Sequence, residues 1–89
     1  MNGLRIKCSV PGCLRTRGRR KGDHRDLTTD DKWLCGEHWR LVPRQTKRIF
    51  FRLCKRGRRA GWPWGMVIAH DRIWARIERE AIETAVGIS

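Results

Sequence analysis

The sequence predicts a small α+β domain in which a short β-hairpin is followed by two or three α-helices. Its 89 residues are the length of one domain, so residues 1–89 are expected to fold as a single unit. Closely spaced cysteines and the turn signal Pro11-Gly12 mark the first third of the chain as a hairpin. Two later stretches repeat their apolar residues with the period of amphipathic helices.

The chain is strongly basic, and the excess charge lies in one part of it. There are 21 Lys and Arg against 9 Asp and Glu, a formal net charge of +12. Residues 1–61 hold 18 basic and five acidic side chains, whereas residues 62–89 hold three and four. We therefore expect a basic part, 1–61, and a C-terminal helix within 62–89 that packs on it. Such an excess is more than solubility requires and is typical of proteins that bind polyanions.

The start of the chain and its hydropathy indicate a cytoplasmic protein without a membrane partner. MNGLRIKCSV lacks the apolar stretch of an export signal, and no segment approaches the roughly 18 apolar residues of a membrane helix. Thiols stay reduced in that compartment, where spaced cysteines more often bind metal than form disulfides. A chain this short has a small core, and such domains usually need a disulfide, a metal or a partner subunit in order to fold.

The helical part is predicted in two segments. Asp30 and Asp31 are expected near the positive end of a helix that begins at Cys35 or Gly36. Pro43 should break this helix and lie in the first turn of the next. From Pro43 to Arg56, one face carries Thr46, Ile49, Phe50, Leu53 and Cys54, and the other carries Arg44, Arg48, Arg52, Lys55 and Arg56.

A last helix is expected from about Trp64 to Val86. Its main apolar stripe, which should close the core, comprises Met66, Val67, Ile73, Trp74, Ile77, Ala81 and Ala85. A second, thinner stripe of Ile68, Ile82 and Val86 is either incidental or a surface for a partner.

Four side chains have the spacing of a metal site. Cys8 and Cys13 flank the Pro-Gly turn, and Cys35 and His38 share one helical face at positions i and i+3. Three thiolates and an imidazole form a closed ligand set typical of one structural Zn²⁺. The alternative is unrelated cysteines, or disulfides that pair Cys8 with Cys13 and Cys35 with Cys54. We expect Cys54 to be a buried small apolar residue rather than a fifth ligand.

With a cysteine turn, a hairpin and a helix whose first turn carries the second ligand pair, residues 8 to about 56 resemble a treble-clef zinc finger. More narrowly, the segment Trp33-Leu-Cys-Gly-Glu-His-Trp-Arg-Leu-Val-Pro43 is similar to short zinc-finger proteins of tailed phages and prophages. The resemblance implies metal ligation by Cys8, Cys13, Cys35 and His38, and a location in a bacterial or phage-infected host cell. It does not assign any activity to the chain. One departure is the four-residue gap between Cys8 and Cys13, because two residues are more usual for this fold.

Two basic clusters are the predicted nucleic-acid contacts. The first, after Cys13, comprises Arg15, Arg17, Arg19, Arg20 and Lys21, and the second comprises Arg44, Lys47, Arg48, Arg52, Lys55, Arg56, Arg58 and Arg59. Few acidic residues interrupt them, which favours DNA or RNA backbones as the partner over a merely solvated face. Phe51 either stacks on an unpaired base or is covered by the last helix.

The sequence therefore predicts a small zinc-finger protein that binds nucleic acid. The alternative is a protein-interaction module, or a phage-borne inhibitor that docks on an acidic host surface through Trp62, Trp64 and the last helix. Trp62 and Trp64 otherwise fill the small core, and Trp33 and Trp39 are expected to shield the metal ligands. Catalysis is not expected, since Asp23-His24 is the only candidate for a metal-dependent nuclease and lacks a second polar ligand. His70 is expected to be a packed residue with a hydrogen-bond partner.

Overall fold

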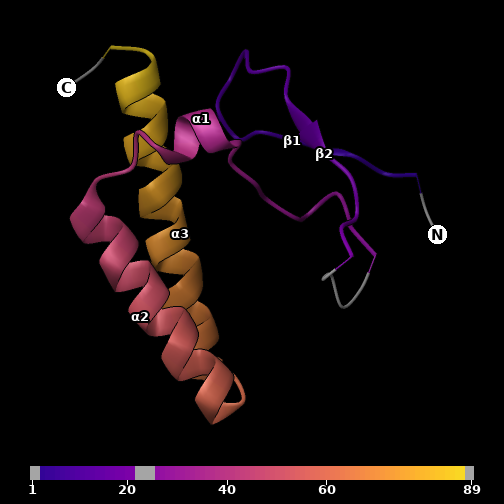
Figure 1. Ribbon diagram of the computed structural model, residues 1–89. Helices are drawn as coiled ribbons and strands as arrows, with labels where there is room; N and C mark the ends of the chain where they lie inside the picture. The colour runs from indigo at the N-terminus through magenta and orange to yellow at the C-terminus, as the bar shows by residue number, and fades with distance from the viewer. Residues whose placement is uncertain (1–2, 22–25, 88–89) are drawn as a thin grey trace.

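The computed structural model describes residues 3–21 and 26–87 and is a small α+β fold (Figure 1). Two short strands precede three helices, which confirms the predicted order of elements. The elements are β1 (Ile6–Lys7), β2 (Thr16–Arg17), α1 (Gly36–Trp39), α2 (Arg44–Ala60) and α3 (Trp64–Ala85). In Figure 1 the long helices α2 and α3 lie side by side, and the hairpin lies across α3 from α2.

The β-hairpin is antiparallel, with Ile6 opposite Arg17 and Lys7 opposite Thr16. Its loop contains a tight turn in which the Cys13 amide donates to the Val10 carbonyl at 3.1 Å. Pro11 and Gly12 occupy the centre of this turn, and Gly12 has φ +84°, the left-handed value that a type II turn requires at its third position. Cys8 and Cys13 therefore lie in the loop that joins β1 and β2. The cysteine turn is thus part of the hairpin and does not precede it.

Asp30 and Asp31 precede α1, as predicted, but a separate turn contains them. The Asp31 carboxylate accepts from the Thr28 amide at 2.7 Å, and the Asp31 amide donates to the Thr28 carbonyl at 3.1 Å. The two residues thus belong to a turn that ends before α1 begins. Asp and Thr side chains form such local turns readily, which satisfies the backbone there without a helix. The acid in the first turn of α1 is Glu37.

Pro43 separates α1 from α2, as predicted. It has the extended ψ of 143° and precedes the first helical residue of α2, so it caps the helix rather than lying within its first turn. Its carbonyl accepts the first bond of the helix, from the Lys47 amide at 3.1 Å. Val42, just before it, is buried, which fixes the corner between the two helices in the core.

A tight connection reverses the chain between α2 and α3. Gly61 ends α2 in the left-handed region at φ +73°, and the Trp62 amide donates to the Gly57 carbonyl at 2.9 Å. Trp62 itself has φ +56°, a conformation uncommon for a bulky residue. Its indole packs directly on Gly57, which has no side chain to obstruct it. Of the two predicted tryptophans, only Trp62 fills a space in the fold, because Trp64 is 74% exposed.

The core joins α3 to the hairpin loop and to the corner before α2. Ile77 and Ala81 of α3 are fully buried, and the same cluster contains Cys8, Val10, Leu34, Cys35 and Val42. Trp74, Ile73 and Ile82 pack against it. The main stripe of the last helix is thus confirmed at its centre.

Three assignments on the helix faces were wrong. Ala85 is exposed, because α3 ends there beyond the core. Ile82 packs against the core rather than standing in a separate stripe with Ile68 and Val86, which are exposed. Ile49 is 40% exposed, because it lies at the edge of the α2 face that meets α3. None of the described helices combines the length and apolar character that crossing a membrane requires.

A buried hydrogen bond fixes α2 against α3. Thr46 of α2 is completely buried, and its hydroxyl donates to the Glu80 carboxylate of α3 at 2.8 Å. Glu80 also accepts from Arg76, one turn earlier on α3, at 3.3 Å. Buried hydroxyls are costly unless they are paired, so this contact favours one register of the two helices.

We expect Gly57→Ala to destabilise the protein although alanine is the better helix former. An added Cβ would lie 2.5 Å from the Trp62 ring, closer than atoms pack, and overfilled sites cost about 1–3 kcal/mol. Gly65→Ala is the matched control, because nothing lies within 4 Å of its Cβ and the substitution gains up to about 1 kcal/mol of helix propensity. Urea unfolding of both variants measures the difference. Equal or greater stability of Gly57→Ala would contradict the packing described.

Candidate metal centre

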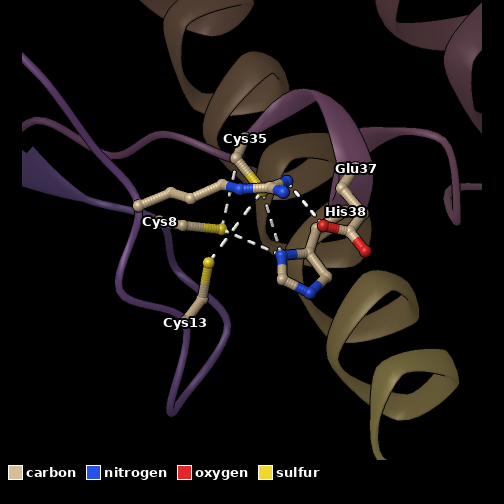
Figure 2. Close-up of polar contacts among 6 residues, drawn as sticks. Cys8, Cys13, Cys35, Glu37 and His38 are labelled. Carbon is tan, nitrogen blue, oxygen red and sulfur yellow. Dashed lines mark hydrogen bonds and ion pairs between the residues drawn. The ribbon is translucent and has the colours of Figure 1, made fainter.

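The four predicted ligands converge from two segments that are far apart in the sequence. Cys8 and Cys13 come from the hairpin loop, Cys35 caps the N-terminus of α1, and His38 follows within that helix. Their ligand atoms all lie within 4.8 Å of one another. Figure 2 shows the three sulfur atoms and one ring nitrogen of His38 pointing toward a common centre. The group is a Cys₃His cluster that could hold a metal ion.

The cysteines of the cluster are free, and the ligand atoms lie close enough to share one ion. His38 Nδ1 lies 3.1 Å from the Cys35 sulfur and 3.4 Å from that of Cys8. The sulfurs of Cys13 and Cys35 are 4.0 Å apart, about twice a disulfide bond length. All four cysteines are free, including Cys54. The alternative in which cysteines pair with one another is therefore wrong.

Local structure explains why the two ligands of each pair already point the same way. Residues i and i+3 face the same way on a helix, so the turn Cys35–His38 directs its two ligands to one side. The Pro-Gly turn does the same for Cys8 and Cys13 in the hairpin loop.

Backbone contacts then join the two pairs. The Ser9 amide donates to the Trp33 carbonyl at 2.8 Å, and the Cys35 amide donates to the Cys8 sulfur at 3.4 Å. A metal would thus bind a site whose ligands are already close, which lowers the ordering entropy that binding must overcome.

Arg15 and Glu37 form a second layer around the sulfurs. The Arg15 guanidinium donates to the Cys35 sulfur at 3.6 Å and pairs with the Glu37 carboxylate at 2.6 Å. Three thiolates, a neutral imidazole and a divalent ion carry a net charge of −1, which the Arg15 charge offsets. Partners of this kind orient metal ligands and tune them. Neither role was predicted, because the contacts depend on Arg15 of the hairpin loop lying next to Cys35 and Glu37 at the start of α1.

The ionisation of the thiols differs with their surroundings. Burial opposes ionisation of Cys35, but hydrogen bonds from the His38 backbone and from Arg15, Cys8 and Cys13 outweigh it and lower its pKa to about 6. Burial raises the pKa of Cys8 in the same cluster. Burial also raises the pKa of Cys54, which stands apart from the cluster on α2. Cys35 therefore becomes a thiolate more readily than Cys8 or Cys54.

Tryptophans cover the cluster only in part. Trp33 and Trp39, the residues expected to shield it, are half-buried and pack against the core that contains Cys8 and Cys35. Trp39 also stacks on Trp74 of α3, with ring centroids 6.4 Å apart, and so connects α1 with the long helices. Cys54 is half-buried on α2, partly as expected for a small apolar residue.

The two predicted basic clusters lie apart and differ in their pairing. In Figure 1 the hairpin and α2 are on opposite sides of α3, so the clusters do not form one surface. Residues of the first cluster have partners within the fold: Arg15 pairs with Glu37, and Arg19 with Asp26 at 3.4 Å.

The α2 cluster is unpaired and mostly exposed. Among residues 3–21 and 26–87, none of the eight cations of α2 forms an ion pair, and all but Lys47 are exposed. The Lys47 ammonium group lies 5.4 Å from the centre of the Trp39 ring. Arg40, which the prediction omitted, is likewise exposed beside them.

The remaining candidates are accounted for as follows. His70 packs against the Phe50 and Trp62 rings and lies 3.4 Å from the Asp71 carboxylate, as expected for a packed histidine with a polar partner. Asp23 and His24, the candidate nuclease pair, lie outside the described residues.

Metal occupancy should protect three of the four cysteines from modification. Bound Cys8, Cys13 and Cys35 should resist a thiol reagent such as dithionitrobenzoate, whereas Cys54, outside the cluster and half-buried, should react, though more slowly than an exposed thiol because burial raises its pKa. A chelator should expose the other three and unfold the chain, because metal binding and folding are coupled in such small domains. Peptide mapping after labelling, with elemental analysis, tests this. Equal labelling of all four cysteines in metal-loaded protein would contradict it.

Arg15→Gln should weaken metal retention without unfolding the protein. Loss of a partner in the second layer typically lowers metal affinity about 10- to 100-fold, here because the Cys35 thiolate loses its compensating charge. Lys21→Gln is the control of equal charge, since Lys21 is exposed and outside the cluster. Competition with a chromophoric chelator measures both affinities. Equal affinities would show that Arg15 does not act on the site.

Comparison of this chain with protein-family models, with curated proteins and with solved structures finds no match. The resemblance to zinc fingers therefore rests on the ligand residues and their spacing, and on the Cys₃His cluster that they form.

Proposed function

We propose that the Cys₃His cluster binds one structural Zn²⁺ and that the protein is a treble-clef-like zinc finger. Zinc–sulfur and zinc–nitrogen bonds of about 2.3 and 2.0–2.1 Å place tetrahedral ligands about 3.5–3.8 Å apart. The observed separations of 3.1, 3.4 and 4.0 Å bracket that range. Four protein ligands complete a tetrahedron, so the ion would have a structural role. The hairpin-loop cysteines and the Cys-His pair at a helix start support the treble-clef comparison.

We further propose that the protein binds nucleic acid through α2. The observation that carries this proposal is the row of eight α2 cations without an ion pair in the described part of the chain. Four of them, Arg44, Arg48, Arg52 and Arg56, recur every fourth residue and repel one another along the helix. Phosphates would relieve this repulsion and release their condensed counterions. A solvated surface helix would instead interleave both signs of charge.

The first cluster would form a second, separate contact, because it lies on the other side of α3 from α2. Arg17, Arg19, Arg20 and Lys21 lie beyond the metal loop, whereas Arg15 is assigned to the metal centre by its contacts. The motif similarity to phage and prophage proteins favours such an origin and a bacterial cytoplasm as the place of action. No catalytic role is proposed.

A second candidate function is docking on another protein. Trp64 is 74% exposed at the start of α3, and Ile68 lies one turn further on the same face with 37% exposure. Exposed tryptophans are enriched at protein interfaces. A Trp64→Ala variant that loses a stoichiometric protein partner, recovered by the wild type from nuclease-treated lysate, would support this function over the first.

Removing charge from α2 should weaken nucleic-acid binding and its salt dependence. For Arg48→Gln with Arg52→Gln, the slope of log Kobs against log salt should fall by about 1.4 for single strands, since two phosphate contacts are lost. Arg72→Gln with Arg79→Gln removes the same charge from the exposed face of α3 and should leave the slope unchanged. Filter-binding titrations across salt provide the measurement. No retention of any nucleic acid by the wild type at low salt would refute the proposed function.

A further inference from the structure

An exposed aromatic ring lies in the middle of the basic face of α2. Phe51 is 55% exposed, and Lys47 and Lys55 lie one helical turn before and after it. At 100° per residue, Arg44 and Arg58 also fall within about 20° of Phe51 around the helix axis. A large apolar side chain surrounded by four cations is unexpected on a face that serves only solubility.

The neighbouring phenylalanine shows that Phe51 is not part of the core. Phe50 contacts His70 and Trp74 of α3, with ring centroids 5.4 and 5.7 Å away. Phe51 has ring contacts only with Trp39 and Phe50 among the described residues, both at 5.8 Å. The expectation that α3 might cover Phe51 is therefore wrong, because Phe50 fills that interface.

Contact with Trp39 nevertheless holds the Phe51 ring in place. Trp39 meets it edge-on at 64°, and the Lys47 ammonium lies over the Trp39 ring at 5.4 Å. Trp39 follows the metal ligand His38 in α1, and its other side stacks on Trp74. Phe51 is thus an exposed ring that packs on Trp39 and has cations beside it. Trp39 in turn directly follows the proposed metal ligand His38.

We propose that α2 binds single-stranded nucleic acid, with Phe51 stacking on an unpaired base while the surrounding lysines and arginines contact phosphates. Every base has a π-face on which an aromatic ring can stack, so this contact requires no particular base. In a duplex these faces are already stacked, so Phe51 could reach them only by wedging the helix open. With 17 residues, α2 is about 26 Å long and would follow about seven stacked nucleotides. This inference rests on the proposed function.

Phe51→Leu is the decisive variant, because leucine keeps an apolar contact with Trp39 and removes only the aromatic face. Fluorescence anisotropy of a short labelled single strand and of the duplex with the same sequence should show tighter binding of the strand by the wild type. Phe51→Leu should weaken strand binding at least about fivefold, the lower limit for loss of a stacked base. Duplex affinity should change less than twofold. The salt slope should stay constant, because no phosphate contact is removed.

Ile49→Ala is the matched control, since Ile49 is a comparably exposed apolar residue of α2 without a ring. It should leave both affinities unchanged. Circular dichroism and zinc content verify that both variants are folded. Ultraviolet crosslinking of the wild-type complex, with the linked peptide containing Phe51, gives the same answer without a substitution.

Three results would overturn the inference while sparing the proposed function. These are tighter binding of duplex than of strand, equal losses from both for Phe51→Leu, and an unchanged strand affinity. Absence of binding to any nucleic acid would instead remove both.

Discussion

The convergence of Cys8, Cys13, Cys35 and His38 is the constraint on which the rest of this structure depends. The hairpin has two residue pairs, and α1 is a single turn, so neither would be stable alone in water. The four residues bring the hairpin loop and the start of α1 together and so close the long loop of chain between Cys13 and Cys35. Because Cys8 and Cys35 are also members of the core cluster with Ile77 and Ala81, the same residues connect the hairpin to α3.

The Cys₃His cluster and the basic helix are connected through aromatic rings. His38 lies in the same turn as Trp39, and the Trp39 ring contacts Phe50, Phe51 and Trp74. Through these rings, order at the ligands extends to both long helices. The chain thereby holds its most repulsive element, α2, against Trp39 of α1 and against α3. This arrangement resolves the conflict between a net charge of +12 and a small core.

Charge in this protein serves two different purposes. Arg15 donates to the Cys35 sulfur of the Cys₃His cluster and pairs with Glu37, so it belongs to the internal electrostatics of the fold. The α2 arginines have no such partners within the described residues and repel one another, which a folded chain tolerates only at a cost in stability. Amino-acid composition alone does not distinguish Arg15, which has an anionic partner, from the arginines of α2. The distinction depends on which cations have an anion within reach.

Local sequence determined much of this protein. The Pro-Gly turn, the i, i+3 spacing of Cys35 and His38, and the break at Pro43 act over a few residues, so their outcomes follow from backbone geometry. The ligand set and the opposing faces of α2 could be predicted for the same reason. Tertiary structure alone decided the Arg15 contact, the Thr46–Glu80 bond and the exposure of Trp64. Each of these depends on the distance between residues far apart in the chain, which periodicity and propensity do not encode.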